Sequence, residues 1–367
     1  MAKPKVAVVL FNLGGPDEPE SVQPFLFNLF NDPAIIRLPN PFRFLLAKLI
    51  SKRRAPVAQE IYQEMGGGSP LVPLTQKQAD ALAEVLSEDW EVKVSIAMRY
   101  WHPMTDEAVR DVKAFAPDHI ILLPLYPQFS TTTTASSIKL WQEEAKRQGL
   151  TADTSTICCY PTQRDFIQSH AKLIAEAYEA TAQHGTPRIL FSAHGLPEKV
   201  VKDGDPYQWQ CEETTRAVVN ALQEISRSAD RASPELASLQ NQEILQEAII
   251  NCYQSRVGPM KWIGPSTEDE IMRAGKEGVP LVVVPIAFVS EHSETLVELD
   301  IEYGKLAVEH GVPHYERVPA LGDDVDFIAG LASACHEVYA GNHIQPAGCG
   351  GIPRICPPEW SECPCKI

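Results

Sequence analysis

The sequence has no apolar run long enough to cross a membrane, and it has few basic residues relative to acidic ones. Its 32 lysines and arginines stand against 48 aspartates and glutamates, which gives a formal net charge of −16. Such a surface repels a polyanion, so nonspecific nucleic-acid binding is disfavoured. No stretch of about 18 uninterrupted apolar residues is present, which excludes a membrane-spanning helix.

Nucleotide-binding motifs and leader segments are also missing. Gly14 and Gly15 follow an apolar run, but they do not have the G-x-G-x-x-G spacing of a dinucleotide site, and residues 66–70 are not followed by the Gly-Lys-Ser/Thr of a phosphate loop. The first five residues lead directly into an apolar run, and we therefore expect a cytoplasmic protein. In a reducing cytosol, its nine cysteines are expected to be thiols or metal ligands rather than disulfides.

What the chain does contain is a regular alternation of short apolar runs and longer amphipathic segments. Residues 120–123 and 281–284 are apolar at every position, which is typical of parallel strands covered by helices on both faces. We therefore predict a doubly wound α/β fold with functional side chains at the carboxyl ends of strands. The predicted strands are 5–12, 91–99, 118–125, 153–159, 187–193, 247–254 and 279–288; the predicted helices are 105–114, 163–183, 207–226 and 292–309.

The chain length predicts more than one domain, because 367 residues are too many for one compact core. We divide the chain into an N-terminal domain (1–165), a second domain (166–310), a closing strand and helix that pack back on the body (311–340), and a tail (341–367). The tail is rich in glycine, proline and cysteine. It lacks a hydrophobic core of its own and would need a cross-link, such as a bound metal, to be ordered.

Two predicted strand ends carry side chains suited to proton transfer or metal binding. His194 ends one strand, and imidazole both exchanges protons and binds metals near neutral pH. The other strand leads into a helical segment that contains His292, Glu294 and Glu298. The carboxylates of Glu294, Glu298 and Glu302 are spaced four residues apart, so they share one helical face. A structural histidine and a solvated acidic face explain this pattern equally well. The functional alternative is a row of carboxylates that binds a divalent cation and passes it toward the interior of the protein, because oxygen and imidazole ligands suit Fe²⁺.

These segments and several others, taken in order, resemble the ferrochelatase family. Residues 192–197 (Ser-Ala-His-Gly-Leu-Pro) are similar to the family signature. The other matching segments are 13–16, 52–54, 66–70, 99–103, 126–130, 254–262 and 285–303. The resemblance covers residues 5–335, and the ordered set rather than any single motif identifies the chain as a member of this family.

The resemblance implies two Rossmann-like domains of the chelatase type, with four-stranded parallel sheets facing a central cleft. It also implies an enzyme, a lyase that inserts Fe²⁺ into protoporphyrin IX to form protohaem with release of two protons, the terminal step of haem biosynthesis. Alternatives are a coproporphyrin III ferrochelatase or another tetrapyrrole chelatase. A non-catalytic porphyrin or haem carrier, or an Fe–S sensor, is the alternative of another class. The presence of both His194 and Glu294 opposes a carrier.

For the site, the resemblance implies that His194 and Glu294 face each other across the macrocycle. One would bind Fe²⁺ and the other would remove pyrrole protons, and the sequence leaves open which does which. His292 and Glu298 would support this catalytic pair. The resemblance also assigns ten residues to the porphyrin wall: Leu13, Arg53, Arg54, Ser69, Arg99, Tyr100, Tyr126, Ser130, Trp262 and Phe288.

Residues 40–54 combine apolar and basic side chains on one predicted helix. An amphipathic helix packed on the core would have the same pattern. The functional alternative resembles the hydrophobic lip of the family, which admits porphyrin and rests on an anionic bilayer. We therefore expect porphyrin and ferrous iron as partners, possible peripheral contact with the inner membrane surface, and no nucleic acid. Arg53 and Arg54 would also meet the porphyrin propionates.

The cysteines of the tail, with an internal pair, resemble the ligands of a [2Fe–2S] cluster in bacterial ferrochelatases. Cys356, Cys363 and Cys365 would be three ligands, and Cys158 or Cys159 the fourth. Such a cluster would bind the tail to the body by coordination. Zinc, which four thiolates also suit, and unliganded thiols are the alternatives, and the tail cysteine at position 349 could replace one ligand.

Overall fold

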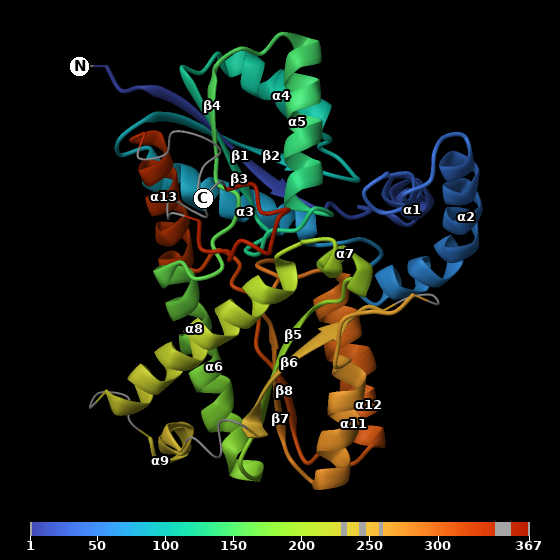
Figure 1. Ribbon diagram of the computed structural model, residues 1–367, viewed down its shortest axis with the longest axis vertical. Helices are drawn as coiled ribbons and strands as arrows, with labels where there is room; N and C mark the ends of the chain where they lie inside the picture. Colours follow the sequence, from blue (N-terminus) through green and yellow to red (C-terminus); the bar gives the residue numbers. More distant parts are fainter. Residues whose placement is uncertain (1, 229–232, 242–246, 257–259, 342–353, 366–367) are drawn as a thin grey trace.

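The computed structural model describes residues 2–228, 233–241, 247–256, 260–341 and 354–365, and it contains the predicted pair of four-stranded parallel sheets. The first sheet has the order β2-β1-β3-β4 and the second the order β6-β5-β7-β8. Figure 1 shows the first sheet above the second. The strands are β1 (Lys5–Asn12), β2 (Glu91–Met98), β3 (His119–Pro124), β4 (Asp153–Thr156), β5 (Arg188–His194), β6 (Ile249–Gln254), β7 (Leu281–Pro285) and β8 (Tyr315–Arg317).

Helices cover both faces of each sheet, which explains why the central strands are apolar at every position. One face of the first sheet packs on α4 (Thr105–Phe115) and α5 (Thr134–Gln148), and the other on α3 (Leu71–Leu86). The second sheet packs between the pair α6 (Arg164–Thr181) and α8 (Tyr207–Arg227) and the pair α11 (Thr267–Glu277) and α12 (Tyr303–Glu309). The predicted fold class is therefore confirmed.

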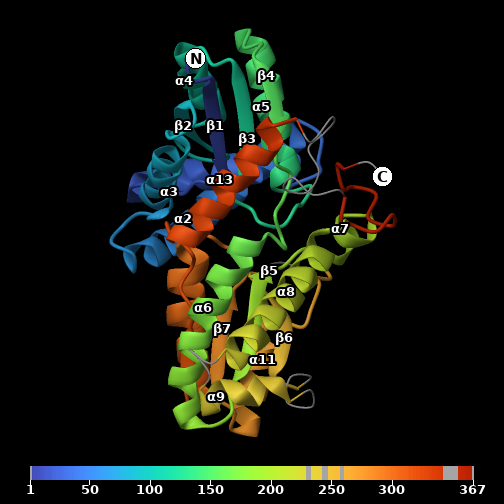
Figure 2. The same cartoon turned by 90° about the vertical axis from the view of Figure 1, so that its left-hand side faces the viewer.

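One helix connects the halves of the molecule. α13 (Val325–Tyr339) returns from the second sheet to pack on α3 and α6, as Figure 2 shows. One continuous apolar cluster contains residues of both sheets and of these helices. α6 begins close to the boundary that we placed after residue 165, but the division into domains stays a prediction.

The segment after β7 differs from the predicted single α-helix over 292–309. Residues Glu294–Glu302 form a π-helix, η4, and α12 follows it. A π-helix has a wider turn than an α-helix and is frequent at functional sites. β8 and α13 lie within residues 311–340, where we predicted a closing strand and helix.

The helices α1 (Val22–Phe30) and α2 (Phe42–Gln63) project from the side of the first sheet (Figure 1). The remaining short elements are η1 (Pro19–Ser21), η2 (Ala182–His184), α7 (Glu198–Lys202), α9 (Pro234–Ala237) and η3 (Ser238–Gln240). Across the described ranges, every helix is too short or too polar to cross a membrane.

His170 on α6 makes the fold sensitive to acid. Its side chain is fully buried, and both ring nitrogens lack a hydrogen-bond partner. Burial lowers the pKa of His170 to about 4. In the unfolded chain, His170 therefore binds a proton below its ordinary pKa of 6.5. In the folded chain, it binds this proton only below about pH 4. Folding stability falls as the pH drops through this window.

Replacing His170 with leucine is expected to reduce this loss. Between pH 7 and pH 5, the free energy of unfolding should fall by about 2 kcal/mol less in the variant than in the wild type. Urea denaturation at both pH values measures the difference, and the same substitution at the exposed His310 is the control. An identical pH dependence in the wild type and His170→Leu would contradict the prediction.

Candidate active site

The predicted catalytic pair comes together where the strand order of the second sheet reverses, between β5 and β7. His194 is the last residue of β5, and Glu294 is the first residue of η4. Nδ1 of His194 lies 2.9 Å from Oε2 of Glu294, although the residues are 100 positions apart in the sequence. Their side chains are 39% and 24% exposed. Because such a switch point faces a crevice, the pair is placed where a ligand of an α/β fold binds.

A hydrogen-bonded group behind the pair holds Glu298 in place. Gln254, at the end of β6, donates to the Glu298 carboxylate and to the backbone carbonyl of Glu294. The amide and hydroxyl of Ser255 both donate to Glu298, at 2.8 and 2.6 Å. Ser255 has a φ of +61°, a strained conformation for a non-glycine residue, and these bonds offset its cost. Polar residues directly after a neighbouring parallel strand were the sequence signal for this group.

The acidic stripe predicted on this helix is divided in the structure. Glu294 faces His194, Glu298 is bonded to the end of β6, and Glu302 is exposed. Glu291, three residues before Glu294, pairs with Arg317 of β8 at 2.6 Å. A continuous row of carboxylates is therefore absent from residues 291–302, since each carboxyl group has a different environment.

Two further side chains contribute to the site. His292 is buried beside the pair, with Nε2 at 3.9 Å from Oε2 of Glu294, and its ring packs against Phe288. Tyr62 of α2 was missed at the sequence level, since nothing in its surroundings distinguishes it from a core tyrosine. Burial raises the pKa of Tyr62 to about 12 despite its hydrogen bond with Ser293. α2 thus brings a hydroxyl group from the first half of the chain next to Glu294.

The protonation states of the pair follow from burial and from mutual attraction. Burial disfavours the imidazolium of His194, but the charge of Glu294 and its hydrogen bond outweigh this effect and raise the pKa of His194. Burial disfavours the carboxylate of Glu294, but the nearby imidazole outweighs it and lowers the pKa of Glu294 to about 2. Burial and the charge of Glu294 raise the pKa of Glu298. The attraction between the two side chains therefore favours the imidazolium of His194 and the carboxylate of Glu294, and Glu298 beside them has a higher proton affinity than an ordinary glutamate.

Some of the predicted wall residues lie next to the pair. A Cβ atom on Gly195 would be 3.3 Å from the ring of Trp262, so this glycine lets the indole approach the backbone beside His194. Phe288 contacts His292. Arg53 and Arg54 are exposed on α2, the helix that contains Tyr62.

Other predicted wall residues are bonded within the protein. Tyr100 is buried, and its hydroxyl donates to Asp32, which also pairs with Arg99 at 2.6 Å. Ser130 is 1% exposed and donates to Asp205. Leu13 packs in an apolar cluster with residues of α1 and α2. The hydroxyl of Ser69 accepts a hydrogen bond from the amide of Leu71, and Tyr126 packs against the first sheet. Contact of these residues with a ligand stays a prediction.

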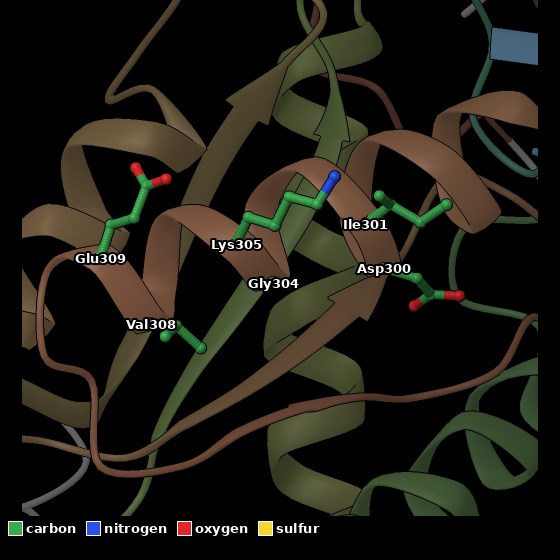
Figure 3. A pocket seen from close by; sticks show the side chains of 6 residues that line it. All are labelled: Asp300, Ile301, Gly304, Lys305, Val308 and Glu309. Carbon is green, nitrogen blue, oxygen red and sulfur yellow. The ribbon is translucent and has the colours of Figure 1, made fainter. Parts of the chain in front are cut away.

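A surface hollow of about 450 Å³ lies away from the pair, along η4 and α12. Figure 3 shows the residues that line it. They are Asp300, Ile301, Gly304, Lys305, Val308 and Glu309. None of them belongs to the predicted site, and the hollow is open to solvent, so we do not assign it to the substrate.

Comparisons with known proteins cover nearly the whole chain. A family model described as Ferrochelatase matches residues 5–338. A protein named Ferrochelatase from Caulobacter vibrioides is 52% identical over 366 residues, which are 99% of this chain and 98% of that protein. The chain belongs to the ferrochelatase family. A Pelagibacter ubique protein of the same name is 48% identical over 368 residues, with 98% of each chain covered.

The fold of this ferrochelatase-family chain also occurs in a solved structure described as SirB from Bacillus subtilis with Fe³⁺. The TM-score is 0.50, with 92% of this chain and 97% of that chain covered. At 13% sequence identity, the likeness concerns the fold alone.

The cysteines that were predicted to bind a cluster converge on one buried group. Cys158, Cys159, Cys356, Cys363 and Cys365 lie together with Phe129 between the halves of the molecule. Sγ of Cys158 lies 3.5 Å from Sγ of Cys365 and 3.3 Å from Sγ of Cys159. Residue 349 lies outside the described residues. Within the described ranges, no group of three or more histidine, cysteine, aspartate or glutamate side chains has an arrangement that could hold a metal ion.

The loop between β7 and η4 is held by Gln78, which sequence reasoning missed. Gln78 is fully buried on α3, and its side-chain amide donates to the carbonyls of Val289 and Gly322 at 2.9 and 2.8 Å. Its carbonyl oxygen accepts from the hydroxyl of Ser290 at 2.8 Å. The first half of the chain therefore positions the loop that leads to Glu294.

Replacing Gln78 with leucine is expected to lower the turnover of iron insertion about tenfold while leaving the KM for porphyrin closer to the wild-type value. The two carbonyls and the hydroxyl would lose buried partners, at a cost of about 1–3 kcal/mol, and the loop would lose its position. Steady-state kinetics and urea denaturation measure the two effects. Gln76→Leu, on the exposed side of the same helix, is the control. Unchanged kinetics in Gln78→Leu would contradict the assigned role.

Proposed function

We propose that this protein inserts ferrous iron into protoporphyrin IX and releases two protons, with His194 and Glu294 as the reacting groups. The contact of 2.9 Å between an imidazole and a carboxylate at the switch point of the second sheet is the observation that carries the proposal. A free-base porphyrin holds two N–H protons, and the lone pairs of its nitrogens lie in the ring plane. A site for this reaction therefore needs a proton acceptor, a ligand for the cation, and a surface that bends the ring.

The chain offers each of these groups. The raised pKa of His194 makes its neutral imidazole a stronger proton acceptor, and the carboxylate of Glu294, whose pKa the imidazole lowers, attracts the cation. The rings of Trp262 and Phe288 supply apolar surface beside the pair. Bending the substrate costs about 1–5 kcal/mol, which contacts with the rest of the porphyrin would supply. Arg53 and Arg54 are placed to meet propionate groups from α2.

The projecting helix α2 supports peripheral attachment to an anionic membrane. Phe42, Leu45 and Leu49 are 65%, 60% and 48% exposed on it, and Val57 is 60% exposed. Lys52, Arg53 and Arg54 are exposed on the same helix. An apolar surface edged by basic residues suits the boundary between headgroups and acyl chains, so we propose a cytoplasmic protein that touches the inner membrane surface.

A [2Fe–2S] cluster is proposed as the resident cofactor, with Cys356, Cys363, Cys365 and Cys158 or Cys159 as its ligands. The burial of these five cysteines in one place supports the proposal, because cysteine thiolates are the ligands of such clusters. The cluster would supply an electron-accepting iron centre and would bind the tail to the body. Residues 354–365 are organised around Arg354, whose guanidinium donates to four backbone carbonyls, those of Cys356, Pro357, Trp360 and Cys365.

An anaerobic absorbance assay tests the proposed reaction. Purified protein is mixed with Fe²⁺ and either protoporphyrin IX or coproporphyrin III, and haem formation is followed. We expect turnover with protoporphyrin IX to exceed that with coproporphyrin III. Faster turnover with coproporphyrin III would favour the alternative substrate, and binding of either porphyrin without turnover would favour a carrier.

Metal and sulfide analysis of the protein as purified tests the cofactor separately. We expect two irons and two sulfides per chain, as the composition of a [2Fe–2S] cluster requires. One zinc per chain without sulfide would instead identify a zinc site.

A further inference from the structure

Two of the five clustered thiols are in contact with a buried glutamine of α8, Gln210. This side chain is 0% exposed, and its amide nitrogen lies 3.1 Å from Sγ of Cys356 and 3.5 Å from Sγ of Cys159. The first contact is to a cysteine of the tail and the second to a cysteine of the body. Gln210 therefore lies where the two groups of thiols meet.

The orientation of the Gln210 amide follows from its other contact. The backbone N–H of Phe129 donates to Oε1 of Gln210 at 2.7 Å. Because a backbone N–H is only a donor, the atom that faces it must be the carbonyl oxygen, and the NH₂ group must face the sulfurs. The N–H bonds that point toward Cys356 and Cys159 are therefore determined by the backbone of the neighbouring segment, which packs in the same cluster.

We propose that Gln210 donates N–H···S hydrogen bonds to the ligand sulfurs of the [2Fe–2S] cluster and thereby raises its reduction potential. The inference rests on the proposed cluster. One-electron reduction adds a negative charge to the iron–sulfur group, and hydrogen-bond donors stabilise the more negative state. In a buried, low-dielectric environment this preference is stronger than in water. Gln210 is a positioning residue here, since it does not bind iron itself.

A buried chain of hydrogen bonds connects Gln210 with the catalytic half. The hydroxyl of Thr214 donates to the backbone carbonyl of Gln210, and Gln128 donates to Thr214 and to the carbonyl of Ile286. Ile286 directly follows β7. Gln128 belongs to the same buried network, but it donates to a hydroxyl and a carbonyl and not to the sulfurs. It is therefore the matched control, because its replacement should disturb the packing of this interior to a similar extent without removing an N–H···S contact.

The test compares Gln210→Met and Gln128→Met with the wild type. Methionine is similar in volume to glutamine but cannot donate a hydrogen bond. Redox titration with dithionite, followed by visible absorption and electron paramagnetic resonance, measures the midpoint potential of the cluster in each protein. We expect a more negative potential in Gln210→Met and a wild-type potential in Gln128→Met. Equal shifts in both variants, or no shift in Gln210→Met, would overturn the proposal.

Cluster stability gives a second readout if Gln210→Met is purified with little iron. Loss of iron to a chelator under anaerobic conditions is then compared among the three proteins. Faster loss in Gln210→Met alone supports the role of the N–H···S contacts, and equal loss in both variants overturns it. A wild-type protein without iron and sulfide would instead show that the proposed cluster itself is wrong, so the two failures are distinguishable.

Discussion

Replacing His194 with alanine or Glu294 with glutamine is expected to abolish iron insertion while leaving porphyrin binding measurable. Loss of a positioned base or acid alone lowers rates by about 10²–10⁴. Each substitution here also leaves the partner side chain without its ion pair. Binding should persist, because the apolar surface of Trp262 and Phe288 remains. The anaerobic assay measures turnover, and quenching of porphyrin fluorescence measures binding.

The control for this prediction is Glu302→Gln, because Glu302 lies on the same π-helix but is exposed. It should keep wild-type turnover, which would separate the role of Glu294 from a general change in the charge of the helix. Full turnover in both His194→Ala and Glu294→Gln would show that the reacting groups are assigned wrongly.

Glu294→Gln also has an expected spectroscopic result. The charge of Glu294 is what outweighs burial at His194, so its removal should lower the pKa of His194. Titration of the histidine ring signals by nuclear magnetic resonance in the wild type and the variant measures this change. A pKa of His194 that stays the same would mean that the two side chains do not interact in solution.

Replacing Asp205 with alanine is expected to destabilise the protein by about 3 kcal/mol or more. Asp205 is 0% exposed and accepts four hydrogen bonds at its carboxyl oxygens. The donors are the hydroxyl of Ser130, the amide and hydroxyl of Thr131, and the amide of Tyr207, at 2.7–3.0 Å. Removing the carboxyl group takes this partner from all four donors, and it separates the loop after β3 from the start of α8.

Urea denaturation measures this effect, and Asp203→Ala is its matched control. Asp203 lies two residues earlier but is exposed, where it pairs with Lys199 and Arg37 on the surface. Exposed ion pairs contribute about 0–1 kcal/mol, so this control should unfold close to the wild type. Equal midpoints for Asp205→Ala and Asp203→Ala would contradict the importance of the buried carboxyl group. The amide of Glu362 donates to the carbonyl of Gly204, next to Asp205, so Asp205→Ala should also weaken the retention of iron by the proposed cluster.

Local sequence predicted the strands and pointed to the two residues that we propose as the reacting groups. Residues 120–123 and 281–284 are apolar throughout, and the structure buries them completely between two layers of helices. His194 and Glu294 drew attention because they follow predicted strands, and the family resemblance implied that they face each other. A polar residue directly after an apolar run is therefore a signal that can be read without the fold.

Only the tertiary structure showed which side chains surround and position His194 and Glu294. Gln78 contacts the carbonyl of Val289, 211 positions away, and no local pattern marks such a contact. Tyr62, Asp205 and Gln210 are likewise defined by neighbours from the other half of the chain. The π-helix also escaped the sequence pattern, because residues four apart share a face in both kinds of helix.

The sequence by itself therefore determined the α/β class, the order of its strands along the chain, and a histidine and a glutamate at two strand ends. The tertiary structure decided that these two side chains meet at 2.9 Å, that Glu291 pairs elsewhere, and that the tail cysteines reach Cys158. The physical reason is the range of the forces involved. Burial and strand propensity act on neighbouring residues, whereas hydrogen bonds between side chains depend on distances that only the folded chain defines.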